Sequence, residues 1–119
     1  MGEKPFDIRE RTFLFGSDII RLCLVLEERR GGIKLLANQL LRSGTSIGAN
    51  IEEGYGTQTD PDFIHKFTIA LKEARETSYW LRQLQACDLM PTADVEPLIN
   101  ESEEIKKILG AIITKKRTQ

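Results

Sequence analysis

Residues 42–56 read RSGTSIGANIEEGYG, and this stretch decides the fold of the chain. It is rich in serine, threonine and glycine, which are poor helix formers, yet the residues around them keep helical spacing. At about 100° per residue, a polar arc lies beside an apolar arc. The polar arc comprises Arg42, Ser43, Ser46, Asn50 and Glu53, and the apolar arc comprises Leu36, Leu40, Ile47 and Ile51. We therefore expect a helix with a core-facing stripe next to a polar stripe.

The composition is that of an ordinary soluble protein. The chain has 119 residues, of which 40% are hydrophobic and 29% charged, and its formal net charge is −1. This length predicts one domain over residues 1–119, large enough to bury a core without disulfides or metal. A dedicated nucleic-acid-binding protein would carry a basic excess. Any anion-binding surface must therefore arise from local arrangement.

The expected location is the cytoplasm. Cys23 and Cys87 lie far apart inside apolar helical patterns, which predicts reduced thiols in the core rather than a disulfide framework. No stretch approaches the roughly 18 apolar residues of a membrane span, and the sequence MGEKPF has no signal-peptide apolar region. We expect no association with membranes.

Four helices are predicted, at about residues 6–30, 33–54, 61–87 and 93–115. The breaks are Gly31–Gly32, a glycine-containing tract before Asp60, and residues 88–91. Asp60 is the expected N-cap of the third helix, with Pro61 in its first position. The apolar seam of that helix has three-four spacing, which is typical of antiparallel bundles. The predicted fold is an all-α, antiparallel up-down four-helix bundle.

The first helix carries more apolar surface than a monomeric bundle needs. Its two adjoining stripes are Phe13, Ile20, Cys23, Leu26 and, beside them, Phe15, Ile19, Leu22, Leu26. One stripe suffices for packing within a bundle, so the width favours burial against another subunit. The alternative is a deeply buried helix of a monomer. A third arc of the second helix holds small residues that permit close approach and are expected between subunits: Ala37, Gly44 and Gly48.

Sequence motifs for catalysis are missing. His65 is the only histidine, and Asp62 rather than a glutamate stands three residues before it, so the Glu-x-x-His pairs of di-iron bundles are absent. There is no phosphate-binding glycine loop, and GTSIGAN follows no strand, so it is not a nucleophile elbow. We expect a non-enzymatic protein without a metal, another cofactor or a small-molecule substrate.

The polar arc has two interpretations. Together with Glu76 of the third helix, its members Arg42, Ser43, Ser46, Asn50 and Glu53 form a predicted structural network that fixes helix register. The alternative is direct contact with an anion or nucleic acid. We favour the structural interpretation, in which Arg42 and Glu76 share the network.

A second set of residues is a candidate nucleic-acid contact. Its members would gather on an oligomer and bind phosphates, with an affinity that weakens as salt rises. The set comprises Arg21, Arg29, Arg30, Lys34, Lys115, Lys116 and Arg117. For the last three, the favoured alternative is a solvated helix end whose cations complement the helix dipole.

The motifs of the second and third helices resemble a bacterial four-helix bundle family. That family is encoded in intervening sequences of large-subunit (23S) ribosomal RNA genes and is sometimes called ribosomal-protein-like. Its second-helix pattern matches Arg42-Ser43, Ser46-Ile47, Asn50-Ile51 and Glu53-Gly54. Its third-helix pattern matches Ile69-Ala70 and Glu76, and the form Glu-Thr-x-Tyr-Trp-Leu matches residues 76–81.

The resemblance extends over nearly the whole chain and implies a quaternary structure. It implies an up-down bundle assembled as a homopentamer around a central channel, with a cellular role that the family name does not define. A relative that is similar in fold is the accessory protein of diversity-generating retroelements, which works with nucleic acid. That relative is markedly basic, whereas this chain is nearly neutral. The expected partner is the chain itself, and RNA or DNA is the alternative.

Overall fold

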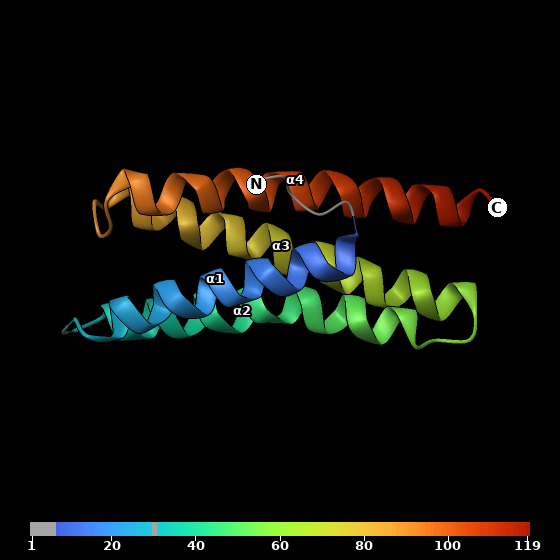
Figure 1. Cartoon of the computed structure of the whole chain (residues 1–119), viewed down its shortest axis with the longest axis horizontal. Helices are drawn as coiled ribbons and strands as arrows, with labels where there is room; N and C mark the ends of the chain where they lie inside the picture. Colours follow the sequence, from blue (N-terminus) through green and yellow to red (C-terminus); the bar gives the residue numbers. More distant parts are fainter. Residues whose placement is uncertain (1–6, 30) are drawn as a thin grey trace.

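The computed structural model describes residues 7–29 and 31–119, which contain four α-helices and no strand. The helices are α1 (Ile8–Glu27), α2 (Ile33–Tyr55), α3 (Asp60–Ala86) and α4 (Thr92–Arg117). They lie lengthwise beside one another, and consecutive helices are joined at alternating ends (Figure 1). α1 packs on α2 and α4, while α3 packs on α2 and α4, in a body of 48 × 31 × 21 Å.

The helix ends differ slightly from those predicted. α1 begins after Asp7, whose carboxylate accepts a hydrogen bond from the Arg9 amide, and it ends at Glu27 rather than at residue 30. The predicted end residues 6 and 30 lie outside the described ranges. The N-cap of α3 is Thr59, so the prediction of Asp60 was wrong. The extended backbone of Thr59 brings its hydroxyl 3.3 Å from the Asp62 amide, which donates to it.

The turn between α3 and α4 places Cys87 at the surface, so its prediction as a core residue was also wrong. α3 ends at Ala86, and Asp88 then takes a left-handed backbone conformation with φ of 53°. The amide of Leu89 donates to the carbonyl of Leu84 at 3.0 Å. α3 therefore ends one residue before Cys87, and the thiol lies in the turn instead of on the apolar side of the helix.

The two cysteines are expected to react at very different rates. Cys23 is 1% exposed, and burial together with the nearby charge of Glu27 raises the pKa of its thiol to about 11. Because the thiolate is the nucleophile, a disulfide reagent at pH 8 should modify Cys87 within minutes and leave Cys23 unmodified in the folded protein. Mass spectrometry of the labelled peptides measures this. Modification of both thiols at equal rates without denaturant would contradict the packing of α1.

The core runs along the centre of the four helices. The largest fully buried side chains are Phe15, Ile19, Leu26, Leu40, Ile47, Ile51, Phe67, Leu81, Leu84, Val95, Ile105 and Leu109. Of the two apolar stripes predicted on α1, the one containing Phe15 and Ile19 faces this core. Phe13 and Ile20 of the other stripe remain exposed within the single chain.

The small residues of α2 pack against α1 of the same chain. A Cβ atom added to Gly44 would lie 2.7 Å from Cγ2 of Ile19, and one added to Gly48 would lie 3.2 Å from the carbonyl oxygen of Thr12. Ala37 is also fully buried. The expectation that this arc lies between subunits was therefore wrong for Ala37 and Gly44. The close approach that it permits is that of the neighbouring helix within the bundle.

Candidate functional site

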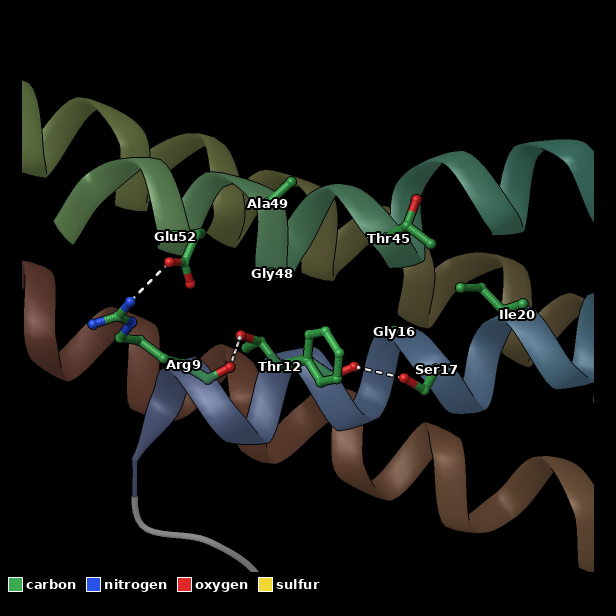
Figure 2. Close-up of a pocket in the computed structure, with 10 residues that line it drawn as sticks. Arg9, Thr12, Gly16, Ser17, Ile20, Thr45, Gly48, Ala49 and Glu52 are labelled. Atoms are coloured by element: carbon green, nitrogen blue, oxygen red, sulfur yellow. Dashed lines mark hydrogen bonds and ion pairs between the residues drawn. The ribbon is translucent and has the colours of Figure 1, made fainter. Parts of the chain in front are cut away.

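A groove of about 450 Å³ runs along the outside of the contact between α1 and α2 (Figure 2). It exists because the small side chains that let the helices approach leave space above them. Gly16 and Gly48 line it where the two helices approach, and Figure 2 shows Thr45 of α2 across from Ile20, with Ala49 further along α2 toward Thr12. The remaining lining residues are Arg9, Thr12, Phe13, Ser17 and Glu52. At one end Arg9 and Glu52 form an ion pair of 2.7 Å across the groove.

Exposed apolar side chains follow α1 beside this groove: Phe13 and Ile20 line it, and Leu24 lies one helical turn beyond Ile20. Phe13 is 70% exposed and Leu24 is 59% exposed, with Ile20 between them. Their spacing of seven and four residues places the three on one side of the helix. We call Phe13, Ile20 and Leu24 the groove strip. Contiguous exposed apolar residues beside a groove are typical of a protein interaction site.

A second exposed apolar pair lies elsewhere on α1. Leu14 and Val25 each follow a member of the groove strip by one residue, so they lie about 100° further around the helix. Val25 is 50% exposed. We call Leu14 and Val25 the lateral pair. α1 therefore presents two different apolar surfaces to solvent in addition to its core-facing stripe.

Part of the predicted polar network is present between α2 and α3. The guanidinium of Arg42 donates to Glu73 at 3.1 Å and also to Glu76. Trp80 Nε1 donates to the same Glu76 carboxylate at 3.0 Å. Below these groups the buried hydroxyl of Thr77 donates to that of Ser43 at 2.9 Å. The contacts of Arg42 and the Thr77–Ser43 bond cross the interface between α2 and α3, whereas the Trp80–Glu76 bond lies within α3.

The other predicted members do not join this cluster. The Ser46 hydroxyl donates to the carbonyl of Arg42, and the Asn50 side-chain amide donates to the carbonyl of Ser46. Both hydrogen bonds therefore lie within α2. Glu53 forms a separate ion pair with Lys66 at 2.7 Å. Glu73, Thr77 and Trp80 were not among the predicted members, although Glu73 and Trp80 stand three and four residues from Glu76 and Thr77 stands four residues from Glu73.

The network makes stability depend on pH. Hydrogen bonds from Trp80 and Arg42 lower the pKa of Glu76. A carboxyl with a depressed folded-state pKa contributes stability above its unfolded-state pKa of about 4.3 and loses it as the pH falls through the folded value. The denaturant concentration at the unfolding midpoint should therefore decrease as the pH is lowered from 7 to 3. In Glu76→Gln that decrease should be smaller. Glu96→Gln, on an exposed position of α4, is the control. An identical pH dependence in wild type and Glu76→Gln would contradict this.

Two further polar clusters hold α4 against its neighbours, and neither was predicted from the sequence. Arg11 donates to both carboxylate oxygens of Glu101, at 2.7 and 2.9 Å, in a largely buried bidentate pair. Ser78 and Lys106 both donate to Glu103, at 2.7 and 2.8 Å. Arg11 and Glu101 are 90 positions apart in the sequence, and Ser78 and Glu103 are 25 positions apart. Only the folded arrangement reveals these two contacts.

The described basic residues predicted for nucleic-acid contact are not gathered within one chain: Arg21 lies inside α1, and the others lie at opposite ends of the bundle. Arg29 and Lys34 flank the α1–α2 turn, whereas residues 115–117 form the last turn of α4 at the other end (Figure 1). Arg21 pairs with Asp18, Arg29 donates to the carbonyl of Leu89, and Lys116 lies 3.4 Å from Asp60.

The exposed candidates without an ion pair in the described part of the chain are Arg29, whose guanidinium is bonded to a carbonyl, and Lys34, Lys115 and Arg117. Arg30 lies outside the described residues. Within residues 7–29 and 31–119, no group of three or more His, Cys, Asp or Glu residues is placed to hold a metal ion. No helix in these ranges is both long and apolar enough to cross a membrane.

Comparisons with known proteins place the chain in a family. The model of the 23S rRNA-intervening sequence protein family matches residues 4–111. A crystal structure from Bacteroides thetaiotaomicron VPI-5482, described as a protein of unknown function from the S23 ribosomal protein family, is 41% identical. The match covers 90% of this chain and 98% of that one, with a TM-score of 0.81. No curated protein matches. The chain belongs to the 23S rRNA-intervening sequence protein family.

Proposed function

We propose that this chain is a non-enzymatic, antiparallel up-down bundle that assembles with copies of itself through the outer surfaces of α1. The proposed assembly is the homopentamer that the resemblance implies, and its proposed location is the cytoplasm. The observation that carries the proposal is the groove strip, in which Phe13 is 70% exposed beside a groove of about 450 Å³. A large apolar side chain in water beside a groove of matching chemistry is stabilised when another surface covers both.

The two apolar surfaces of α1 favour a ring over a two-fold dimer. A two-fold interface uses the same patch on both partners, whereas a head-to-tail interface joins two different patches and can close into a ring. The groove strip and the lateral pair are different patches on one helix. In the proposed ring, Leu14 and Val25 of one copy pack against the groove strip of the next.

The energetics make this assembly sensitive to single side chains. Fully burying one large apolar side chain contributes about 1.5–3 kcal/mol. The groove strip and the lateral pair are already partly covered, so their combined contribution is on the order of 5–10 kcal/mol per interface. Association costs about 4–15 kcal/mol in lost freedom. Since the two sums are similar, loss of any one of these side chains should dissociate the assembly.

Hydroxyl-radical footprinting tests the proposal on the chain as it is. In the assembly, Phe13 and Val25 should be protected from oxidation, and the protection should decrease on dilution as copies separate. Tyr79 on α3 is 45% exposed and serves as the internal reference that stays reactive at every concentration. The contradicting result has two parts. The oxidation rate of Phe13 would not change with protein concentration, and its ratio to the rate of Tyr79 would match the ratio of their exposures in the single chain. That result would exclude this surface as the interface.

A second candidate function is nucleic-acid binding by cations gathered on the oligomer. It is favoured by the exposed cations Lys34, Lys115 and Arg117, which no described acidic group neutralises and which every copy would repeat. Titration of labelled RNA at two ionic strengths tests it. Binding that weakens steeply with salt is expected, and binding that is absent at low salt or indifferent to salt would remove this function.

A further inference from the structure

The outward side of α3 carries a line of cations around an aromatic ring. Lys72, Arg75, Tyr79 and Arg82 follow one another at intervals of three and four residues, and all four are exposed. This spacing places them along one side of the helix over about 15 Å. The guanidinium of Arg82 lies 5.9 Å from the centre of the Tyr79 ring. We call these four residues the basic stripe.

The acidic groups beside the basic stripe form their hydrogen bonds and ion pairs with other residues, while Lys72 acts on Glu76 and Arg82 on Glu103 only through longer-range attraction. On the α2 side, Glu73 and Glu76 accept from Arg42, and Glu76 also accepts from Trp80. On the α4 side, Glu103 accepts from Ser78 and Lys106. In the described part of the chain, Lys72, Arg75 and Arg82 have no ion-pair partner. The stripe therefore keeps a local positive charge although the whole chain has a net charge of −1.

We propose that the basic stripe binds single-stranded nucleic acid, with Lys72, Arg75 and Arg82 at backbone phosphates and a base stacked on Tyr79. Cations that follow the backbone and an aromatic ring that accepts a base are the two elements of such sites. An acidic protein surface would satisfy the cations but would leave the exposed ring without a role. The ligand class is that of the second candidate function, on which this inference rests, whereas the residues are different.

The basic stripe is separate from the proposed assembly surface. α3 packs on α2 and α4, and the groove strip and lateral pair lie on α1. A copy seated on α1 therefore leaves the outward side of α3 free for a ligand. Changes to the stripe should leave the mass of the assembly unaltered, so failure of this inference is distinguishable from failure of the assembly.

Fluorescence anisotropy with a labelled single-stranded RNA of mixed sequence tests the stripe. The triple variant Lys72→Gln, Arg75→Gln, Arg82→Gln should bind at least about tenfold more weakly at about 50 mM salt, and its log–log salt slope should be shallower by about two. The comparison variant Lys66→Gln, Lys107→Gln removes cations that lie outside the stripe and outside the set of the second candidate function, and it should change affinity by less than about threefold. Equal losses in the stripe variant and the comparison variant, or loss only in the comparison variant, would overturn the proposal.

The aromatic position separates nucleic acid from an acidic protein partner. Tyr79→Ala should weaken RNA binding about fivefold or more, whereas Tyr79→Phe, which keeps the ring, should bind as wild type does. Polyglutamate should displace the RNA only weakly. If Tyr79→Ala has no effect and polyglutamate competes as well as unlabelled RNA, the stripe is a surface for acidic protein and the proposal is wrong. Absence of RNA binding by wild type at low salt would also contradict it.

Discussion

Phe13→Glu is expected to convert the assembly into monomers while the helices remain folded. Phe13 is 70% exposed in the single chain, so a carboxylate there costs the isolated bundle little. In the interface the same change removes about 1.5–3 kcal/mol of apolar burial and adds the desolvation of a charge. The dissociation constant should therefore rise at least about a hundredfold. Sedimentation velocity measures this, and circular dichroism reports on the helices.

The control for this variant is Tyr79→Glu, a comparable change at an exposed aromatic residue of α3. It should leave the mass of the assembly unchanged. Val25→Glu should also produce monomers, because the lateral pair is the other half of the proposed interface. Mixing Phe13→Glu with Val25→Glu should then restore one intact interface and yield a heterodimer. A mixture that stays entirely monomeric would contradict the head-to-tail arrangement, and unchanged assembly by both variants would contradict the interface itself.

Gly44→Ala is expected to lower the free energy of unfolding by about 1 kcal/mol, and by no more than about 2 kcal/mol. The added Cβ would lie 2.7 Å from Cγ2 and 3.1 Å from Cβ of Ile19, so it meets the base of a buried side chain. Overpacking of this kind costs about 1–3 kcal/mol, and it outweighs the gain of about 1 kcal/mol that alanine normally brings to a helix. Denaturant unfolding at one fixed protein concentration measures the change, because assembly makes apparent stability depend on concentration.

Gly110→Ala provides the matched control for Gly44→Ala. Gly110 also lies inside a helix, but a Cβ there meets no atom within 4 Å. This variant should be more stable than wild type by about 0.5–1 kcal/mol. The pair isolates the contact between α1 and α2 from helix propensity. If both glycines gave the same stabilisation on replacement, the close packing of Gly44 on Ile19 would not exist.

The number and order of the helices were predictable because each depends on local pattern. Apolar periodicity and turn signals such as Gly31–Gly32 and Pro91 act over a few residues, so they locate helices before any packing is known. The choice between the two stripes of α1 was not predictable in this way. Phe13 and Phe15 have the same chemistry, and only the positions of α2 and α4 decide that Phe15 is buried.

The polar contacts, too, were predictable where they depend on local pattern and not where they depend on how the helices pack. The arc containing Arg42 indicated a polar surface beside the core, and the structure places Arg42 against Glu76 on α3. Its second contact, with Glu73, depends on the register between α2 and α3, which helical spacing alone does not determine. The prediction also grouped Ser46 and Asn50 with Arg42 because they share its arc. Hydroxyl and amide groups on a helix can instead bond to the carbonyl four residues earlier, and both do so.

The mass of the wild-type protein in solution tests the proposed self-assembly most directly. Light scattering coupled to size-exclusion chromatography, at micromolar concentration and moderate salt, should give a single species several times the 13.5 kDa mass of the chain, with five copies the expected number. The absorbance ratio of the same peak reports any co-purifying nucleic acid. A clean monomer of 13.5 kDa across this concentration range would contradict the proposal that the outer surfaces of α1 join copies of the chain.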